Sequence, residues 1–226
     1  MGPFWKPRVK ICCINSIQEA WLAIQYGASA LGLVSEMPSG PGVIPEELIA
    51  EIAAVVPPSI STFLLTSIQN TSAIIEQHRR CRTNVIQLCD RLKVGSYEEL
   101  REAMPGIGIV QVIHVTKEEA LEEAVAVASD VDGILLDSGN RASRVKELGG
   151  TGRTHDWSLS RRIRETVNTP IFLAGGLNPE NVAEAIKKVQ PFGVDVCSGV
   201  RTNGKLDEMK LSAFFNQVSS SAVAIC

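Results

Sequence analysis

Short apolar segments alternate with amphipathic segments along most of the chain. Most positions within an apolar segment are apolar, which is typical of strands buried on both faces of a parallel sheet. They predict strands at residues 9–14, 30–35, 61–65, 84–88, 107–114, 133–136, 170–174 and 193–197. The amphipathic segments predict helices, among them residues 17–26, 46–55, 71–80, 117–128, 158–165, 179–189 and 207–218.

Eight strands separated by helices within 226 residues predict a (β/α)8 TIM barrel, with residues 1–226 as a single domain. An open doubly wound sheet is the main alternative. The strand count favours the barrel, and no Gly-x-Gly-x-x-Gly follows the first strand, as a dinucleotide-binding sheet would require. In such a barrel the chemistry lies at the carboxyl ends of the strands.

The last two predicted strands end in small residues. Gly175 and Gly176 follow one strand, and Ser198 and Gly199 follow the other; we call these two pairs the phosphate loops. Glycine lets the backbone turn tightly and bring its N–H groups close to an anion. We expect a helix to begin at Asn178-Pro179 and to add its unpaired first amides. A lone Gly-Gly also serves as strand-to-helix punctuation, but two such loops in successive units favour phosphate binding.

Composition narrows the classes of partner. The chain is 45% hydrophobic and 5% aromatic, with a formal net charge of -3, so it presents no field that would attract nucleic acid or an anionic membrane. A small phosphorylated metabolite is the expected partner. The sequence has no apolar stretch long enough to cross a bilayer and no signal-peptide pattern at residues 1–8, which leads us to expect a cytoplasmic protein.

Six cysteines in a chain of this length do not indicate a disulfide framework. No Cys-x-x-Cys pair is present, and no histidine pair lies near a carboxylate, so no metal is implied. We expect reduced thiols and a monomer or homodimer. The tail at residues 219–226 is expected either to be disordered or to pack across the base of the barrel.

Several motifs together resemble one family, phosphoribosylanthranilate isomerase, the barrel of tryptophan biosynthesis. The resemblance spans nearly the whole chain and is strongest from Gly133 onward. The motifs are Lys-Ile-Cys at 10–12, Leu-Leu-Asp-Ser at 135–138, Gly-Gly-Thr-Gly-Arg-Thr-His-Asp-Trp at 149–157, Leu-Ala-Gly-Gly-Leu-Asn-Pro-Glu-Asn-Val at 173–182 and Gly-Val-Asp-Val-Cys-Ser-Gly-Val at 193–200.

The resemblance implies an Amadori rearrangement of an aminoaldose phosphate to an aminoketose, without a cofactor. It implies Cys12 as the general base and Asp137 as the general acid. It further implies Lys10, Gln87 and Arg153 as substrate contacts, with residues 149–152 in a loop that covers the substrate.

The chemistry sets opposite demands on the two catalytic groups. A thiol needs a modest lowering of its pKa from about 8.5 to give a thiolate near neutral pH. An aspartate needs its pKa raised from about 3.9 by burial before it can hold a proton to donate. Without the resemblance, Cys12 reads as a buried hydrophobe. An aspartate after an apolar segment is more often a turn or cap residue, but the place of Asp137 at the end of the sixth strand, before the Gly-rich loop at 139–156, favours an acid catalyst. We expect Cys13 to point to the opposite face from Cys12 and to pack under the first helix.

Two segments depart from the family pattern, both where the aromatic half of the substrate is recognised. Residues 38–45 lack the arginine that normally follows strand two, and residues 87–91 replace Gln-Leu-His-Gly by Gln-Leu-Cys-Asp-Arg. An arginine–carboxylate contact contributes about 1.5–3 kcal/mol. We hypothesise that Arg91, or secondarily Arg201, supplies the missing cation.

Three functions remain open from the sequence. The first is a phosphoribosylanthranilate isomerase whose carboxylate contact has moved. The second is a related isomerase or other enzyme that acts on a different phosphosugar. The third is a barrel that binds a phosphorylated metabolite without turnover; retention of both Cys12 and Asp137 argues against it, because phosphate binding needs neither.

Overall fold

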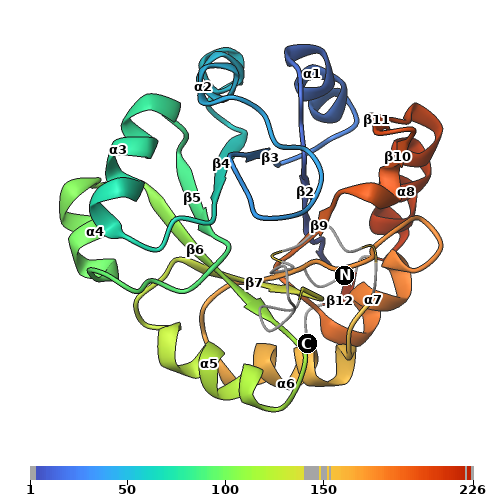
Figure 1. The fold of residues 1–226 in the computed structure, drawn as a ribbon. Helices are drawn as coiled ribbons and strands as arrows, with labels where there is room; N and C mark the ends of the chain where they lie inside the picture. The colour runs from blue at the N-terminus through green and yellow to red at the C-terminus, as the bar shows by residue number, and fades with distance from the viewer. Residues whose placement is uncertain (1–3, 140–147, 149–151, 153, 222, 225–226) are drawn as a thin grey trace.

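A computed structural model shows a closed barrel of parallel strands surrounded by helices (Figure 1). The structure describes residues 4–139, 148, 152, 154–221 and 223–224. The barrel strands, in spatial order, are β2 (Arg8–Ile11), β3 (Ala30–Val34), β4 (Ser61–Thr66), β5 (Val85–Leu88), β6 (Gly108–His114), β7 (Gly133–Asp137), β8 (Ile171–Leu173) and β9 (Gly193–Val196). The order follows the sequence, and β9 closes the barrel on β2 with Ile11 paired to Val196.

The helices form the outer ring (Figure 1). They are α1 (Ile17–Gln25), α2 (Glu46–Val55), α3 (Thr71–Cys81), α4 (Tyr97–Ala103), α5 (Glu119–Val127), α6 (Trp157–Thr166), α7 (Val182–Val189) and α8 (Glu208–Ser220). Every residue of β3, β7, β8 and β9 is buried, Asp137 and Asp195 included, as expected of strands covered on both faces. The (β/α)8 prediction is confirmed.

Polar side chains mark where helices begin. Ser16 accepts a hydrogen bond from the amide of Glu19 at the start of α1, and Asp207 accepts from Met209 and Lys210 at the start of α8. Such caps satisfy amides that have no partner within the helix. They fix where each strand-to-helix loop ends, and therefore which residues remain in the loops above the barrel.

One strand end, one helix start and one unpredicted helix are the largest differences from the prediction. Strand β2 ends at Ile11 rather than at residue 14, because Cys13 has a φ of 62° and turns the chain out of the sheet. Helix α4 was not among the predicted helices; its seven residues bury only Leu100, which leaves little apolar periodicity to detect. Helix α7 begins at Val182 rather than at residue 179.

The two ends of the described chain lie together (Figure 1). Strand β12 (Val223–Ala224) pairs antiparallel with β1 (Phe4–Trp5), which leads into the first barrel strand. Within the tail considered above, Ser219 and Ser220 thus belong to the last turn of α8 and Val223–Ala224 form a strand. Lys6, just before the first barrel strand, donates from Nζ to Ser219 Oγ at 2.9 Å. In the described part of the chain, no helix combines the length and apolar character needed to cross a membrane.

Candidate active site

A pocket opens at the carboxyl ends of the barrel strands, where the fold predicts chemistry. Six of the site residues predicted from the sequence line it: Cys12, Gln87, Asp137, Gly175, Gly176 and Ser198. They come from strands or loops at five places around the barrel. The fold therefore brings together residues that are up to 186 positions apart (12 to 198) in the sequence.

Lys10 lies beneath this pocket and is fully buried. Its Nζ lies 2.9 Å from Asp195 Oδ1, on the neighbouring strand β9, and 5.2 Å from the ring centre of Phe63. Burial lowers the pKa of Lys10, but the Asp195 carboxylate together with Cys12 and Cys13 outweighs burial and holds the pKa above its ordinary value. A permanent positive charge therefore lies under the site.

Asp137 ends β7 and is only 6% exposed. Burial raises the pKa of Asp137 from 3.8 to about 6, although the amide of Ser138 donates a 2.7 Å hydrogen bond to Oδ1 and opposes that rise. The direction is the one required of a carboxylic acid that holds a proton to donate. Cys12, two residues after Lys10, is 5% exposed and lines the same pocket.

The phosphate loops have the backbone geometry expected of an anion site. Gly175 and Gly176 have φ of 81° and 63°, a left-handed conformation that glycine adopts without strain. A β-carbon on Gly199 would lie 2.0 Å from the carbonyl oxygen of Leu177, so only glycine lets the two loops touch. Among the described residues, no acceptor is paired with the backbone amides of 175, 176, 198 and 199.

The helix expected at Asn178-Pro179 does not supply further amides. The side chain of Asn178 accepts hydrogen bonds from the amides of Glu180 and Asn181 at 3.0 Å each. These bonds hold residues 178–181 in a turn, and α7 begins only afterwards. The prediction of open helix amides at this position is wrong, because a local side chain has satisfied them.

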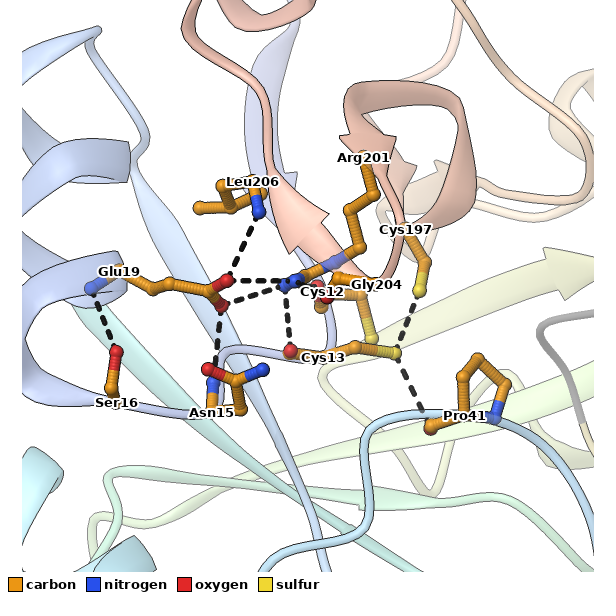
Figure 2. A network of polar contacts seen from close by, with 10 residues as sticks. All are labelled: Cys12, Cys13, Asn15, Ser16, Glu19, Pro41, Cys197, Arg201, Gly204 and Leu206. Atoms are coloured by element: carbon orange, nitrogen blue, oxygen red, sulfur yellow. Dashed lines mark hydrogen bonds and ion pairs between the residues drawn. The ribbon is translucent and has the colours of Figure 1, made fainter.

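Cys13 also differs from its prediction. Its positive φ turns the side chain back toward the pocket, which it lines, instead of under α1. Its Sγ donates to the carbonyl oxygen of Pro41 at 3.6 Å and lies 2.8 Å from Sγ of Cys197 (Figure 2). Strand alternation does not apply here, because β2 has already ended.

Two residues of the site were not selected from the sequence. Asp195 lines the pocket and binds Lys10, and Cys197 lines it beside Cys13. Asp195 could have been selected, because it is a charged residue within the apolar segment 193–197 and a buried charge needs a partner. Nothing in the sequence pointed to the contact between the two thiols.

Comparison with known proteins gives a consistent result. Residues 9–217 match the family model described as N-(5'phosphoribosyl)anthranilate (PRA) isomerase. The N-(5'-phosphoribosyl)anthranilate isomerase of Methanosarcina acetivorans is 35% identical over 94% of this chain and 93% of its own length. The chain belongs to the PRA isomerase family.

Solved structures of the family share this fold. A PRA isomerase from Thermotoga maritima superposes with a TM-score of 0.78 at 31% identity, covering 95% of this chain and 99% of that protein. Another PRA isomerase, crystallised with reduced 1-(o-carboxyphenylamino)-1-deoxyribulose 5-phosphate, gives a TM-score of 0.76 at 29% identity, with the same coverage.

The structure removes both candidates for a relocated carboxylate contact in this PRA isomerase family member. Arg91 lies outside the pocket lining, and its guanidinium binds Glu123 through Nε at 2.8 Å and Nη2 at 2.5 Å. The side chain of Arg91 is 62% exposed. The loop after β5 turns this residue outward, toward α5, so in this structure Arg91 does not face the pocket.

Arg201 is buried in a network at the edge of the site (Figure 2). Its Nη1 and Nη2 bind the Glu19 carboxylate at 2.9 and 3.0 Å, and Nη2 donates to the carbonyl oxygen of Cys13 at 2.6 Å. Its charge is thus neutralised by α1, and it holds the turn after β2 instead of a ligand. Arg153, also predicted as a substrate contact, lies outside the described residues.

Proposed function

We propose that this protein catalyses the Amadori rearrangement of N-(5'-phosphoribosyl)anthranilate, with Asp137 as general acid and Cys12 as general base. One observation carries the assignment. Asp137 is buried, its pKa is raised to about 6, and it lines one pocket with a thiol and with phosphate loops whose backbone amides have no acceptor among the described residues. A barrel that only binds phosphate needs no carboxyl group whose pKa is raised by burial.

The reaction needs two proton transfers. Asp137 donates a proton to the ring oxygen while the C1–O bond breaks and the nitrogen lone pair forms a C=N bond. Cys12, as the thiolate, then removes the proton from C2, and the electron pair returns to nitrogen to give an enolamine. Transfer of the enol proton to C1 yields the aminoketose. No electron leaves the substrate, so no redox cofactor takes part.

The lining of the pocket suits the parts of this substrate. The phosphate loops would hold the phosphate through backbone N–H groups, as anions are held elsewhere. The side-chain oxygen of Gln87 is buried with no hydrogen-bond partner among the described residues, and it can accept from a sugar hydroxyl or the amine. Val34, Met37 and Leu65 line the pocket with apolar atoms suited to an aromatic ring.

The carboxylate of anthranilate has no cationic partner among the described lining residues. We propose that this contact is made by Arg153, which the family resemblance implies as a substrate contact and which lies outside the described residues. The alternative is a different phosphosugar that lacks the carboxylate. In either case the ligand is a small phosphorylated metabolite, and we expect the protein to act as a monomer or homodimer in the cytoplasm; a related structure from Thermotoga maritima is of monomers generated from a dimeric isomerase.

The decisive experiment follows the fluorescence of freshly generated phosphoribosylanthranilate with purified protein. The wild-type protein should consume it. Cys12→Ser and Asp137→Asn should each lower kcat by about 10²- to 10⁴-fold, because each removes a positioned proton carrier. Cys81→Ala, which removes a thiol of α3 outside the pocket, should retain activity.

Two outcomes would contradict the proposal. Turnover that survives Cys12→Ser would show that this thiol is not the base. No turnover by folded wild-type protein would favour the different phosphosugar, and aminoaldose phosphates without a carboxylate should then be tested. In the active case, Arg153→Ala should raise KM at least tenfold and leave kcat nearly unchanged, since a contact made equally in the ground and transition states affects binding alone.

A further inference from the structure

Two thiols that the proposed reaction does not use face each other at the edge of the pocket (Figure 2). Sγ of Cys13 and Sγ of Cys197 lie 2.8 Å apart, closer than ordinary van der Waals contact, and both residues line the pocket. Neither is a member of the acid–base pair. Their partners and surroundings decide what chemistry they can perform.

Rigid elements hold the pair in place. Cys197 directly follows β9 and Cys13 lies two residues beyond β2, its neighbour in the barrel. The amide of Cys12 donates to the carbonyl oxygen of Val196 at 2.8 Å, which extends the pairing of the two strands up to the thiols. The positive φ of Cys13 then directs its side chain toward Cys197, and Arg201 fixes that turn through the carbonyl oxygens of Cys12 and Cys13.

The two sulfur atoms differ in protonation. The hydrogen bond with Cys13 lowers the pKa of Cys197. Burial opposes this change, and the positive charge of Arg201 adds to it. Hydrogen bonding to Cys12 and Cys197, together with burial, raises the pKa of Cys13. Cys197 is also partly exposed, so a small reagent in the pocket can reach the sulfur that is more readily ionised. Burial raises the pKa of both Cys81 and Cys89 to about 12, which keeps those thiols unreactive.

We propose that Cys13 and Cys197 form a redox-modification site, a dithiol that a low-molecular-weight disulfide converts to a Cys13–Cys197 disulfide and that a thiol reductant restores. This goes beyond the isomerisation, which uses neither sulfur. Only the effect on turnover described below rests on the proposed function.

The oxidation is a pair of exchange steps. The thiolate of Cys197 attacks one sulfur of the reagent disulfide, forming a mixed disulfide and releasing the first reagent thiolate. Cys13 gives its proton to solvent, and its sulfur attacks Cys197 Sγ, which breaks the mixed disulfide and releases the second thiolate. Two electrons pass from the protein to the reagent, which leaves as two thiols once its thiolates take up protons.

The crosslink would join two parts of the active site. Cys13 directly follows the base Cys12 and donates to the carbonyl oxygen of Pro41 in the loop after β3. Cys197 directly precedes Ser198 in a phosphate loop. Oxidation consumes the thiol hydrogen of Cys13 and ties both loops together. We expect kcat/KM to fall at least fivefold and to recover on reduction.

The test treats the folded full-length protein with oxidised glutathione and maps its peptides by tandem mass spectrometry. We expect loss of two thiols, one linkage between Cys13 and Cys197, and reversal by dithiothreitol. Cys13→Ser and Cys197→Ser should each abolish the linkage. Cys12→Ser should still form it, which excludes a Cys12–Cys197 bond, and so should Cys81→Ala.

The outcomes separate this inference from the proposed function. A linkage through Cys12, a stable glutathione adduct without ring closure, or no loss of thiols would overturn the redox site, whatever the activity. A Cys13–Cys197 linkage that leaves kcat/KM within twofold would overturn the coupling to turnover. If the reduced protein does not consume phosphoribosylanthranilate, the proposed function fails, while the peptide map still decides the linkage.

Discussion

The two sides of the pocket are built differently. The ends of β7, β8 and β9 supply Asp137, Asp195 and the phosphate loops, all with charged groups or unpaired amides. The ends of β3, β4 and β5 supply mainly apolar atoms, with Ser39 and Gln87 as polar exceptions. The first side can bind a phosphate and move protons, whereas the second can cover an aromatic ring but offers no described cation.

This contrast shows where the specificity of the chain is concentrated. Charge on the β7–β9 side is buried and paired, so small changes there have large costs. Apolar lining on the β3–β5 side tolerates different ring substituents, because hydrophobic contact is not directional. Substitutions on the first side should therefore have larger effects than substitutions near the second.

Lys10 should show the largest effect on stability. Lys10→Met leaves the Asp195 carboxylate buried without its cation, which costs about 3–5 kcal/mol. Urea unfolding at pH 7 measures the free energy of unfolding. The exposed pair Arg79–Glu76 provides the control, since Arg79→Met should cost less than about 1 kcal/mol. Adding Asp195→Asn to Lys10→Met should recover part of the loss; equal losses in the single and double variants would contradict a charge effect.

The raised pKa of Asp137 should lower the free energy of unfolding at high pH. Its native pKa of about 6 lies above the unfolded value near 3.9, so the native state binds the proton more tightly. The stability that this group contributes is present below about pH 4 and is lost as the pH rises through about 6. The free energy of unfolding of Asp137→Asn should therefore exceed that of wild type by about 2–3 kcal/mol at pH 8. The difference should shrink toward pH 4.

Urea unfolding of wild type and Asp137→Asn at several pH values between 4 and 8 measures this dependence. If the difference between the two proteins did not change with pH, the pKa of this carboxyl group would not be raised, and its assignment as the acid would lose its main support.

Gly199 tests the contact between the phosphate loops. In Gly199→Ala the new β-carbon would meet the carbonyl oxygen of Leu177, so one loop must move away. We expect KM for the phosphorylated substrate to rise at least tenfold. The control is Gly108→Ala at the opposite end of the barrel, where the nearest atom to the new β-carbon is a Val85 methyl at 3.3 Å. This substitution should leave KM unchanged. An unaltered KM in Gly199→Ala would show that this contact does not shape the phosphate site.

Arg91 should show the smallest effect. Its pairing with Glu123 is largely exposed on the arginine side, and such pairs contribute less than about 1 kcal/mol. Arg91→Ala should change KM for phosphoribosylanthranilate by less than twofold in the fluorescence assay. A tenfold rise would mean that Arg91 turns toward the substrate when it binds, and the contrast between the two sides of the pocket would weaken.

The sequence by itself determined the barrel and much of the candidate site. Strand and helix periodicity depend on neighbours a few residues apart, so the eight strands could be placed to within a few residues. The phosphate loops were predicted because glycine marks a special backbone at strand ends, where barrel chemistry lies. The roles of Cys12 and Asp137 were implied by the family resemblance. The positions of strands and helices are therefore encoded by residues that are close together in the sequence.

Only the tertiary structure decided which side chains meet. Arg91 and Arg201 are equally basic in the sequence, yet acidic partners on α5 and α1 neutralise them away from the ligand. The contact of Cys13 with Cys197 depends on barrel closure and on a left-handed residue beyond β2. These ion pairs and contacts join residues that are far apart in the sequence, so no local sequence pattern predicts them.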